Sequence, residues 1–209
     1  LPILESVRRC INSGDRIHRI EAVLSGTMNY IFSTYNGGPA ANGSEPTFAQ
    51  VVRNAQEAGY TEPDPRLDLS GRDVLRKLII MAREAGIPID ENDVDSVPVL
   101  PAEYFSGDVN AFYKMLEDNE ETFSSHWKEA AGKGCRQRFI ASIESDGDSG
   151  YRCSMGLRDV SQEHPLYNLA GTDNSAIITT DFYPSPLVIQ GAGAGAFQTA
   201  GGILNDILQ

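Results

Sequence analysis

An acidic loop that runs directly into a helix is the feature of this sequence that most limits how the chain can fold. The loop is residues 59–69, GYTEPDPRLDL. Pro63 and Pro65 fix their own φ angles and keep the residue before each of them out of the α-helical conformation. Its acidic residues are Glu62, Asp64 and Asp68. We therefore expect these carboxylates to lie on a stiff, extended segment, which can hold each of them in one place.

The helix after this loop is expected to begin at Ser70. Serine is a common N-cap, and Asp73 follows it at the spacing in which both side chains accept from backbone N–H groups of the first turn. Val74, Leu78, Met81 and Ala85 recur at helical spacing and should face a core. Asp73 and Lys77 stand four residues apart, and are therefore neighbours on the helix surface. This pattern puts a carboxylate and an amine at the mouth of the Glu62 loop.

The same residues also have purely structural interpretations. Asp73 can be only a helix cap, and its pair with Lys77 only a surface ion pair of small energetic value. The acidic side chains of the loop can simply be solvated in a chain that is rich in acid. A calcium loop is a third interpretation, but the prolines and the lack of a D-x-[DN]-x-[DN]-G run argue against it.

The charge balance of the chain argues against two classes of partner. The chain has 29 acidic and 17 basic residues, a net charge of −12, which repels nucleic-acid phosphates and anionic membrane surfaces. No apolar run approaches the ~18 residues of a membrane-spanning helix. We therefore expect no nucleic-acid partner and no membrane partner.

Cysteine and histidine usage gives no sign of a metal site. Cys10, Cys135 and Cys153 are odd in number and far apart, so neither a disulfide framework nor a zinc site is expected. The three histidines lack paired ligand spacing. A reducing, cytoplasmic setting fits this usage. The sequence begins with Leu1 rather than Met, and we expect it to be a piece of a longer protein.

Hydrophobic periodicity and turn residues predict an α+β fold, with a mixed sheet covered by helices on one face. Strands are expected at 16–24, near 97–99, and at 138–145, 151–158, 175–183 and 187–190. Helices are expected at 3–13, 25–35, 47–58, 70–85, 108–116, 120–131 and 197–208, and a surface loop at 36–46. Phe123 and Trp127, four residues apart, should form a packing stripe.

Glycines between the last strand and the last helix invite a dinucleotide-binding interpretation. The spacing at 191–195, GAGAG, is G-x-G-x-G rather than the G-x-G-x-x-G of a Rossmann fold. Residues 196–209 are also too few to supply the further strand and the acidic residue about 20 positions on that such a fold requires. This stretch is therefore not a self-contained nucleotide fold, and a tight strand-to-helix turn accounts for it. The 25–27 turn, SGT, similarly suits either an anion at a helix N-terminus or a simple helix cap.

Three blocks of the chain together resemble the homoserine dehydrogenases. They are GYTEPDPRLDLSGRDVLRK at 59–77, SGTMNYIF at 25–32 and GAGAG at 191–195. They stand in that family's order and cover nearly the whole chain. The resemblance implies reversible interconversion of L-homoserine and L-aspartate 4-semialdehyde with NAD(P), within threonine, methionine and isoleucine biosynthesis.

The resemblance also implies roles for individual residues. Lys77 is the implied proton donor or acceptor. The implied substrate ligands are Glu62, Asp73, the backbone of Gly59 and, with a weaker match, Thr27. Gly195 is implied to lie near the nicotinamide end of the cofactor.

In the resembled family, residues preceding the equivalent of Leu1 supply a nucleotide-binding domain, a further lysine near the substrate and much of a monovalent-cation site. We therefore expect residues 1–190 to form a substrate-binding and dimerisation domain of a homodimer. Residues 191–209 should be a return segment that packs on the absent domain, and the isolated chain should be inactive. The family's long form also carries an upstream aspartate kinase. Two alternatives stay open: a non-catalytic dimerisation or regulatory module, and an unrelated amino-acid-binding domain.

Overall fold

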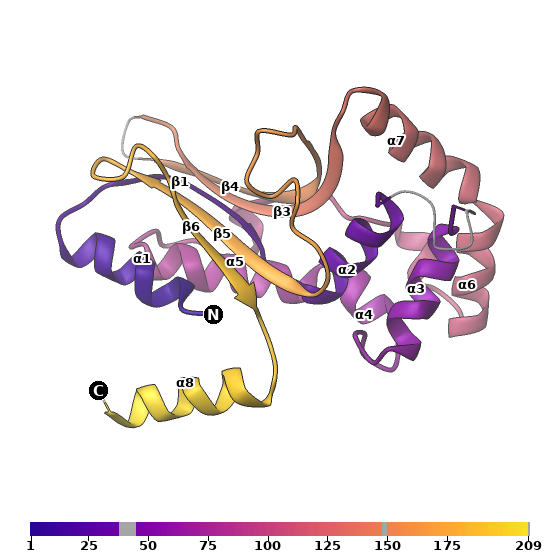
Figure 1. Cartoon of the computed structure of the whole chain (residues 1–209), viewed down its shortest axis with the longest axis horizontal. Coiled ribbons are helices and arrows are strands. Elements are labelled where there is room, and N and C mark those ends of the chain that lie inside the picture. Colours follow the sequence, from indigo (N-terminus) through magenta and orange to yellow (C-terminus); the bar gives the residue numbers. More distant parts are fainter. Residues whose placement is uncertain (38–44, 148–149, 209) are drawn as a thin grey trace.

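The computed structural model describes residues 1–37, 45–147 and 150–208. Most of the surface loop expected at 36–46 therefore lies outside the described residues. The remaining chain folds into one mixed sheet, with helices against one face and a helical lobe at one end (Figure 1). This arrangement confirms the expected α+β class.

The sheet has six strands in the order β2-β4-β3-β1-β5-β6. Their bounds are β1 Ile17–Val23, β2 Val94–Ser96, β3 Arg136–Ser145, β4 Tyr151–Val160, β5 Asp173–Thr180 and β6 Leu187–Ala192. β2 pairs parallel with β4, and the other neighbouring strands pair antiparallel. The long β3–β4 ladder runs from Arg136↔Val160 to Ser145↔Tyr151.

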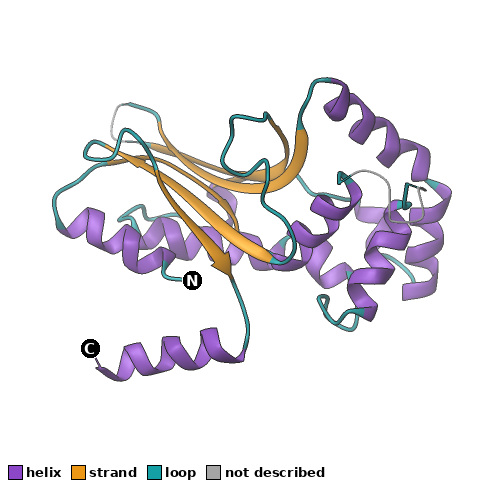
Figure 2. Ribbon diagram, viewed as in Figure 1, coloured by secondary structure: helices purple, strands orange, loops and turns teal. Residues whose placement is uncertain are grey.

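Two groups of helices surround this sheet (Figure 2). Helices α1 (Ile3–Asn12) and α5 (Arg72–Glu84) lie along one face, and α2 (Gly26–Tyr35) packs against β3 and β5 at its end. The lobe beyond α2 contains α3 Phe48–Glu57, α4 Arg66–Leu69, α6 Val109–Asp118 and α7 Glu120–Gly132, with a 3-10 turn at Ala102–Phe105 beside α6. A second 3-10 turn, Glu91–Asp93, contacts α5 and leads into β2. Phe123 and Trp127 pack against the main core, as their spacing predicts.

Several helix ends follow from the local sequence. Ser25 caps α2 by accepting from Met28 N at 3.2 Å, and Asp108 caps α6 by accepting from Ala111 N at 2.8 Å. Thr47 and Gln50 form the expected capping box of α3. These contacts satisfy backbone N–H groups that a helix leaves unpaired in its first turn.

The start of α5 differs from the sequence prediction, because Ser70 is not its N-cap. The Ser70 hydroxyl donates to the carbonyl oxygen of Leu67 at 2.7 Å and closes the short helix α4, so Asp68 is helical rather than extended. Gly71 then takes a left-handed φ of 72° and separates α4 from α5, which begins at Arg72. A Cβ at Gly71 would lie 3.2 Å from Met155 Cε, so the break is packed closely against the sheet.

The short strand expected near 97–99 lies instead at Val94–Ser96. The N–H of Val97 still donates to the Met155 carbonyl oxygen at 2.9 Å. Pro98 has no N–H, so the pairing stops there.

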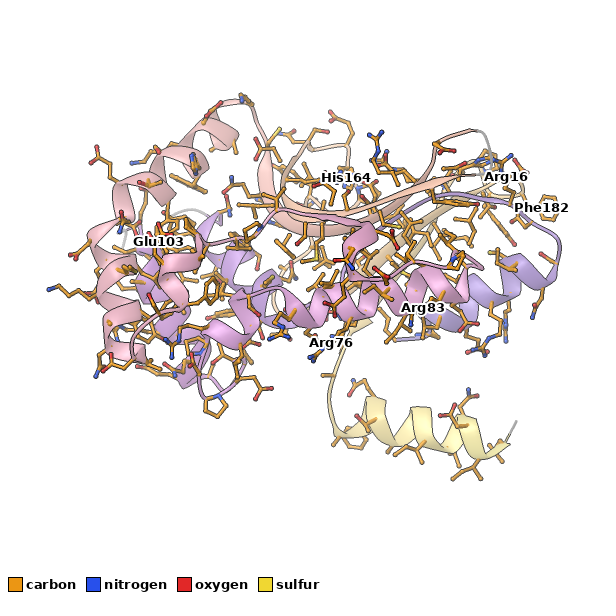
Figure 3. All side chains as sticks on the ribbon, turned by 180° about the vertical axis from the view of Figure 1, so that it is seen from behind. Arg16, Arg76, Arg83, Glu103, His164 and Phe182 are labelled. Carbon is orange, nitrogen blue, oxygen red and sulfur yellow. The ribbon has the colours of Figure 1, made fainter. Side chains whose placement is uncertain are left out.

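The face of the sheet away from α1 and α5 has a smaller apolar cluster of its own. It is made of Val23, Ile140, Val160, Leu166, Leu169 and Ile177. Leu166 and Leu169 belong to segment 161–172, which crosses this face between β4 and β5. Figure 3 shows His164, from this segment, on the opposite side of the sheet from Arg83 of α5.

A buried arginine holds segment 161–172 in place. Arg138 is 1% exposed and donates to the carbonyl oxygens of Leu166 (3.1 Å), Tyr167 (2.8 Å) and Leu169 (2.9 Å). Burial lowers the pKa of the Arg138 guanidinium to about 10. The segment that leads into β5 is therefore fixed by charge-assisted hydrogen bonds to its backbone.

Helix α8 (Ala196–Leu208) stands apart from the body of the molecule (Figure 1). Phe197 is 90% exposed and Ile207 is 73% exposed, and no described residue of this helix is buried. Figure 3 shows the helix separated from the other elements, with side chains on more than one of its sides. Across the described ranges, no helix is long and apolar enough to cross a membrane.

Candidate active site

A cavity of about 540 Å³ lies where the three blocks of the sequence meet. It is bounded by the start of α2, the loop before α4, the first turns of α5, the start of β5 and the turn after β6. Its lining residues are Ser25, Gly26, Thr27, Gly59, Tyr60, Glu62, Asp68, Asp73, Lys77, Thr172, Asn174, Gly193, Ala194 and Gly195.

Lys77 supplies the amine of this cavity. Its Nζ lies 2.7 Å from Asp73 Oδ2, one helical turn away, and donates to the carbonyl oxygen of Leu24 at 2.9 Å. These two contacts use two of the three N–H groups of an ammonium. The Lys77 side chain is 44% exposed, at the mouth of the cavity that Glu62 also lines. One N–H therefore remains free for a bound molecule.

Asp68 connects two walls of the cavity. Its Oδ1 accepts from the Thr27 hydroxyl at 3.0 Å, and its Oδ2 accepts from the backbone N–H of Glu62 at 2.9 Å. The Thr27 hydroxyl also lies within donating distance of the Tyr60 carbonyl oxygen. Thr27 is 8% exposed, so this network lies mostly out of solvent and fixes the Glu62 loop against α2.

The third acid of the loop, Asp64, does not line the cavity. It binds Arg66 through both carboxylate oxygens, with Nε–Oδ1 at 2.9 Å and Nη2–Oδ2 at 2.6 Å. Hydrogen bonding to Arg66 holds the pKa of the Asp64 carboxyl below its ordinary value. Arg66 Nη1 also donates to the Gly107 carbonyl oxygen at 2.8 Å. Asp64 therefore braces the loop against the segment before α6.

The structure brings together all the site residues that the sequence analysis singled out. Lys77, Gly59, Glu62, Asp73, Thr27 and Gly195 line one cavity. Gly59 also ends α3 with a left-handed φ of 74°, as expected of a C-terminal glycine. The chemical roles of these residues stay predictions.

Asp68, Thr172 and Asn174 are among the lining residues that were not assigned to the site from the sequence. Asp68 belongs to the acidic loop, but nothing in the sequence indicates that it accepts a hydrogen bond from Thr27. Thr172 and Asn174 belong to no recognisable motif. They reach the cavity because β5 pairs with β6, which sets Asn174 opposite Gly191. The backbone at Thr172 also lies very close to the start of α2, because a Cβ built on Gly26 would be 2.7 Å from the Thr172 carbonyl oxygen.

The two sides of the cavity differ in charge. Lys77, Glu62, Asp68 and Asp73 gather on the side of α4 and α5, whereas the side formed by β5 and residues 193–195 carries neutral groups. Gly193 and Gly195 present backbone without side chains, and Gly195 has a φ of 137°. This wall therefore offers backbone and amide groups without net charge. Within the described residues, no group of three or more His, Cys, Asp or Glu side chains is placed to hold a metal ion.

Comparison with known proteins identifies the family to which this chain is similar. The family model described as "Homoserine dehydrogenase" matches residues 2–208. The chain is 37% identical over 212 residues to the homoserine dehydrogenase of Saccharomyces cerevisiae, covering 100% of this chain and 57% of that protein. It is 38% identical over 211 residues to a chloroplastic bifunctional aspartokinase/homoserine dehydrogenase 2 of Zea mays, covering 100% of this chain and 22% of that one.

A similar solved structure is that of a Candida auris protein described as of unknown function. It superposes with a TM-score of 0.89 at 34% identity, covering 100% of this chain and 57% of that chain. The present chain thus spans about half the length, or less, of these proteins. The matched model, the identity along the whole chain and the shared fold together show that this chain belongs to the homoserine dehydrogenase family.

Proposed function

We propose that this chain is the substrate-binding half of a homoserine dehydrogenase, which interconverts L-homoserine and L-aspartate 4-semialdehyde with NAD(P). The observation that carries the proposal is the position of Lys77, whose amine lies at the mouth of a cavity lined also by Glu62 and Asp73. An amino acid with a reacting oxygen needs such a combination: carboxylates for its ammonium group and a proton donor for its oxygen.

In this proposal Lys77 gives a proton to the aldehyde oxygen during reduction and takes it back during oxidation. Its free N–H is the one that reaches the substrate, while the Leu24 carbonyl oxygen and Asp73 orient the amine. Glu62 and Asp73 bind the substrate ammonium, together with the backbone of Gly59. Thr27 acts on this pocket through Asp68, which fixes the Glu62 loop.

The cofactor supplies the hydride when it is bound. Residues 193–195 and Asn174 form the wall that would face its nicotinamide ring. Residues 191–209 would pack against a nucleotide-binding domain carried by a longer chain. This contact would cover the apolar side chains of α8 that are exposed here. The isolated chain would therefore be inactive, and a monovalent-cation site would be completed outside it. We also propose that the longer chain carries an aspartate kinase upstream, the activity that the name of the maize relative includes.

A homodimer would form through the face of the sheet away from α1 and α5. Val188 of β6 is 48% exposed and pairs with Ile177, so it lies on that face. Beside it, Arg19 pairs with Glu144 at 3.2 Å, and both side chains are partly exposed. A mixed apolar and charged surface of this kind can pair with a second copy of itself. An Arg19→Glu, Val188→Glu variant should sediment as a monomer if this face is the interface.

The test of catalysis is Lys77→Ala in the longer protein that we propose carries this domain. Loss of a general acid should lower kcat for homoserine oxidation by about 10²- to 10⁴-fold, with a smaller change in KM. Lys133→Ala is the matched control, because it also removes the lysine of an i,i+4 ion pair, with Glu129, but at the end of α7 and away from the cavity. An unchanged rate in Lys77→Ala would instead favour a non-catalytic dimerisation or regulatory module.

An amino-acid-binding domain unrelated to this chemistry is distinguished by calorimetry. Homoserine affinity of this chain should rise when the cofactor domain is present, because in the proposed enzyme that domain completes the site beside residues 193–195. Equal affinity with and without that domain would favour the binding-domain alternative. We also propose a cytoplasmic setting and a place in threonine and methionine biosynthesis, which follow from the same family resemblance.

A further inference from the structure

Asn174 is a buried polar residue in the cavity wall with no partner for its side chain. It is 8% exposed, and its Oδ1 lies out of solvent without a hydrogen bond. Among the described residues its Nδ2 makes no hydrogen bond either, although the residue lines the cavity. A buried amide that has lost water without gaining a partner destabilises the fold. Such a group is expected where a ligand completes the bonding.

Other buried asparagines of the described chain use the N–H groups of their amides, although Asn29 Oδ1 is also without a partner. Asn29 Nδ2 lies 3.0 Å from the carbonyl oxygens of Gly171 and Asp173 and 3.3 Å from that of Ala170. Asn36 donates to the Phe32 carbonyl oxygen at 2.6 Å. The contacts of Asn29 also fix the backbone just before Asn174, so the unused amide is held in position.

The amide of Asn174 lies directly against the turn that follows β6. A Cβ built on Gly193 would be 2.3 Å from Asn174 Nδ2 and 3.0 Å from Oδ1. The amide therefore occupies the space that a side chain at position 193 would need. Asn174 and the backbone of Gly193 form one continuous neutral surface in the cavity.

We propose that Asn174 hydrogen-bonds the carboxamide of the cofactor's nicotinamide ring. The zwitterionic substrate is drawn to the charged side, which holds Lys77, Glu62 and Asp73. The nicotinamide ring carries one uncharged polar substituent, a carboxamide, with one acceptor oxygen and two N–H donors. Asn174 offers the same set, and the two amides form a reciprocal pair when the Asn174 side chain turns so that Oδ1, which now lies out of solvent, faces the cavity together with Nδ2. The inference rests on the proposed function, because that function brings a nicotinamide to this cavity.

The experiment compares Asn174→Ala and the similarly sized Asn174→Leu with the wild type in the longer protein. We expect the Kd for NADH or NADPH, measured by cofactor fluorescence without substrate, to rise about tenfold. The KM for the cofactor should rise with it, and the KM for homoserine should change little. In cofactor-free protein, the unfolding temperature should stay the same or increase, since an unpaired buried amide has been removed.

A cofactor analogue tests the amide pair itself. In the 3-acetylpyridine analogue a methyl group replaces the amide NH2, so one of the two hydrogen bonds is already lost. The effect of Asn174→Ala on Kd should then shrink to about threefold or less. An equal effect with both cofactors would overturn the proposed pairing.

Ser175→Ala is the matched control. Ser175 is the next residue, 1% exposed, and its Oγ is also without a partner, but it does not line the cavity. Its cofactor Kd should equal that of the wild type. If Asn174 were only structural, its variants would lose stability and keep their cofactor affinity, which would contradict the inference. If the wild type turned over no homoserine, the proposed function would fail first.

Discussion

The hydroxyl of Thr27 donates to Asp68 Oδ1 at 3.0 Å, which ties the first turn of α2 to the short helix α4 across 41 positions of sequence. The other oxygen of Asp68 accepts from the N–H of Glu62. Neither Thr27 nor Asp68 needs to touch the substrate to matter. Together they fix the loop that carries Glu62.

Removing this link should weaken both stability and substrate binding. Thr27→Val keeps the shape of the side chain but deletes the donor, so the free energy of unfolding should fall by about 1–3 kcal/mol. In the longer protein the KM for homoserine should rise more than kcat falls, because the Glu62 loop loses its support. Urea unfolding and steady-state kinetics measure the two effects. Thr122→Val, at an exposed position of α7, is the control, and an equal effect there would refute the role of the link.

Asp64 predicts a specific dependence of stability on pH. The Arg66 hydrogen bonds lower the folded-state pKa of Asp64 below the ordinary value of 3.8. The stabilisation is therefore fully present above about pH 4 and is lost as the pH falls toward the lower, folded value, because the unfolded state takes up the proton first. Asp64→Asn should lose about 1 kcal/mol near neutral pH and show a flatter acid limb.

Urea unfolding at a series of pH values tests this prediction. Asp118→Asn, an exposed acid at the end of α6, is the control. If Asp64→Asn kept the full acid dependence of the wild type, the Arg66 pair would not be its source.

Alanine substitutions at two left-handed glycines distinguish the cost of backbone strain from the cost of disturbed packing. Gly71 and Gly86 have φ values of 72° and 80°, but a Cβ would meet Met155 Cε at 3.2 Å at Gly71 and nothing within 4 Å at Gly86. Gly86→Ala should lose about 1 kcal/mol of unfolding free energy from the left-handed conformation alone. Gly71→Ala should lose about 2–3 kcal/mol, because packing against the sheet is also disturbed. Equal losses in chemical denaturation would show that the sheet yields to the added methyl group.

Helix α8 should behave differently in the isolated chain and in the longer protein. Phe197→Ser removes a side chain that is 90% exposed here, so unfolding of the isolated chain should change by less than about 0.5 kcal/mol. In the longer protein the same change should lower the unfolding temperature by several degrees, since we propose that α8 packs on a second domain. Val97→Ser, at another exposed apolar position, should have little effect in either form. If Phe197→Ser left the unfolding temperature of the longer protein unchanged as well, α8 would not pack on a second domain.

The sequence predicts much of this fold where the signal is local. Capping residues and apolar spacing locate α2, α3 and α6 within a few residues, and the spacing of Asp73 and Lys77 predicts their pair. The break at Gly71 was missed because Ser70 is an equally good cap by residue type. Its hydroxyl is instead used by the Leu67 carbonyl oxygen.

Local sequence patterns do not predict contacts between residues that are far apart in the chain. Nothing near Asn174 in the sequence indicates that it faces Gly193, since that contact depends on the β5–β6 register. The clamp formed by Arg138 on segment 161–172 likewise joins residues with no local pattern in common. The candidate site was therefore mostly predicted on its charged side, where one segment supplies most of the groups. On its neutral side Gly195 was predicted, whereas Thr172 and Asn174 were missed.

The pairing of β5 with β6 has a consequence for how the protein acquires its pocket during synthesis. Lys77 and Glu62 leave the ribosome early, but the wall opposite them is made of residues 172–174 and 193–195. A nascent chain that ends before these residues has the acids and the amine without an enclosure. Ligand recognition should thus emerge late in translation, after the body of the helical layer has already been made.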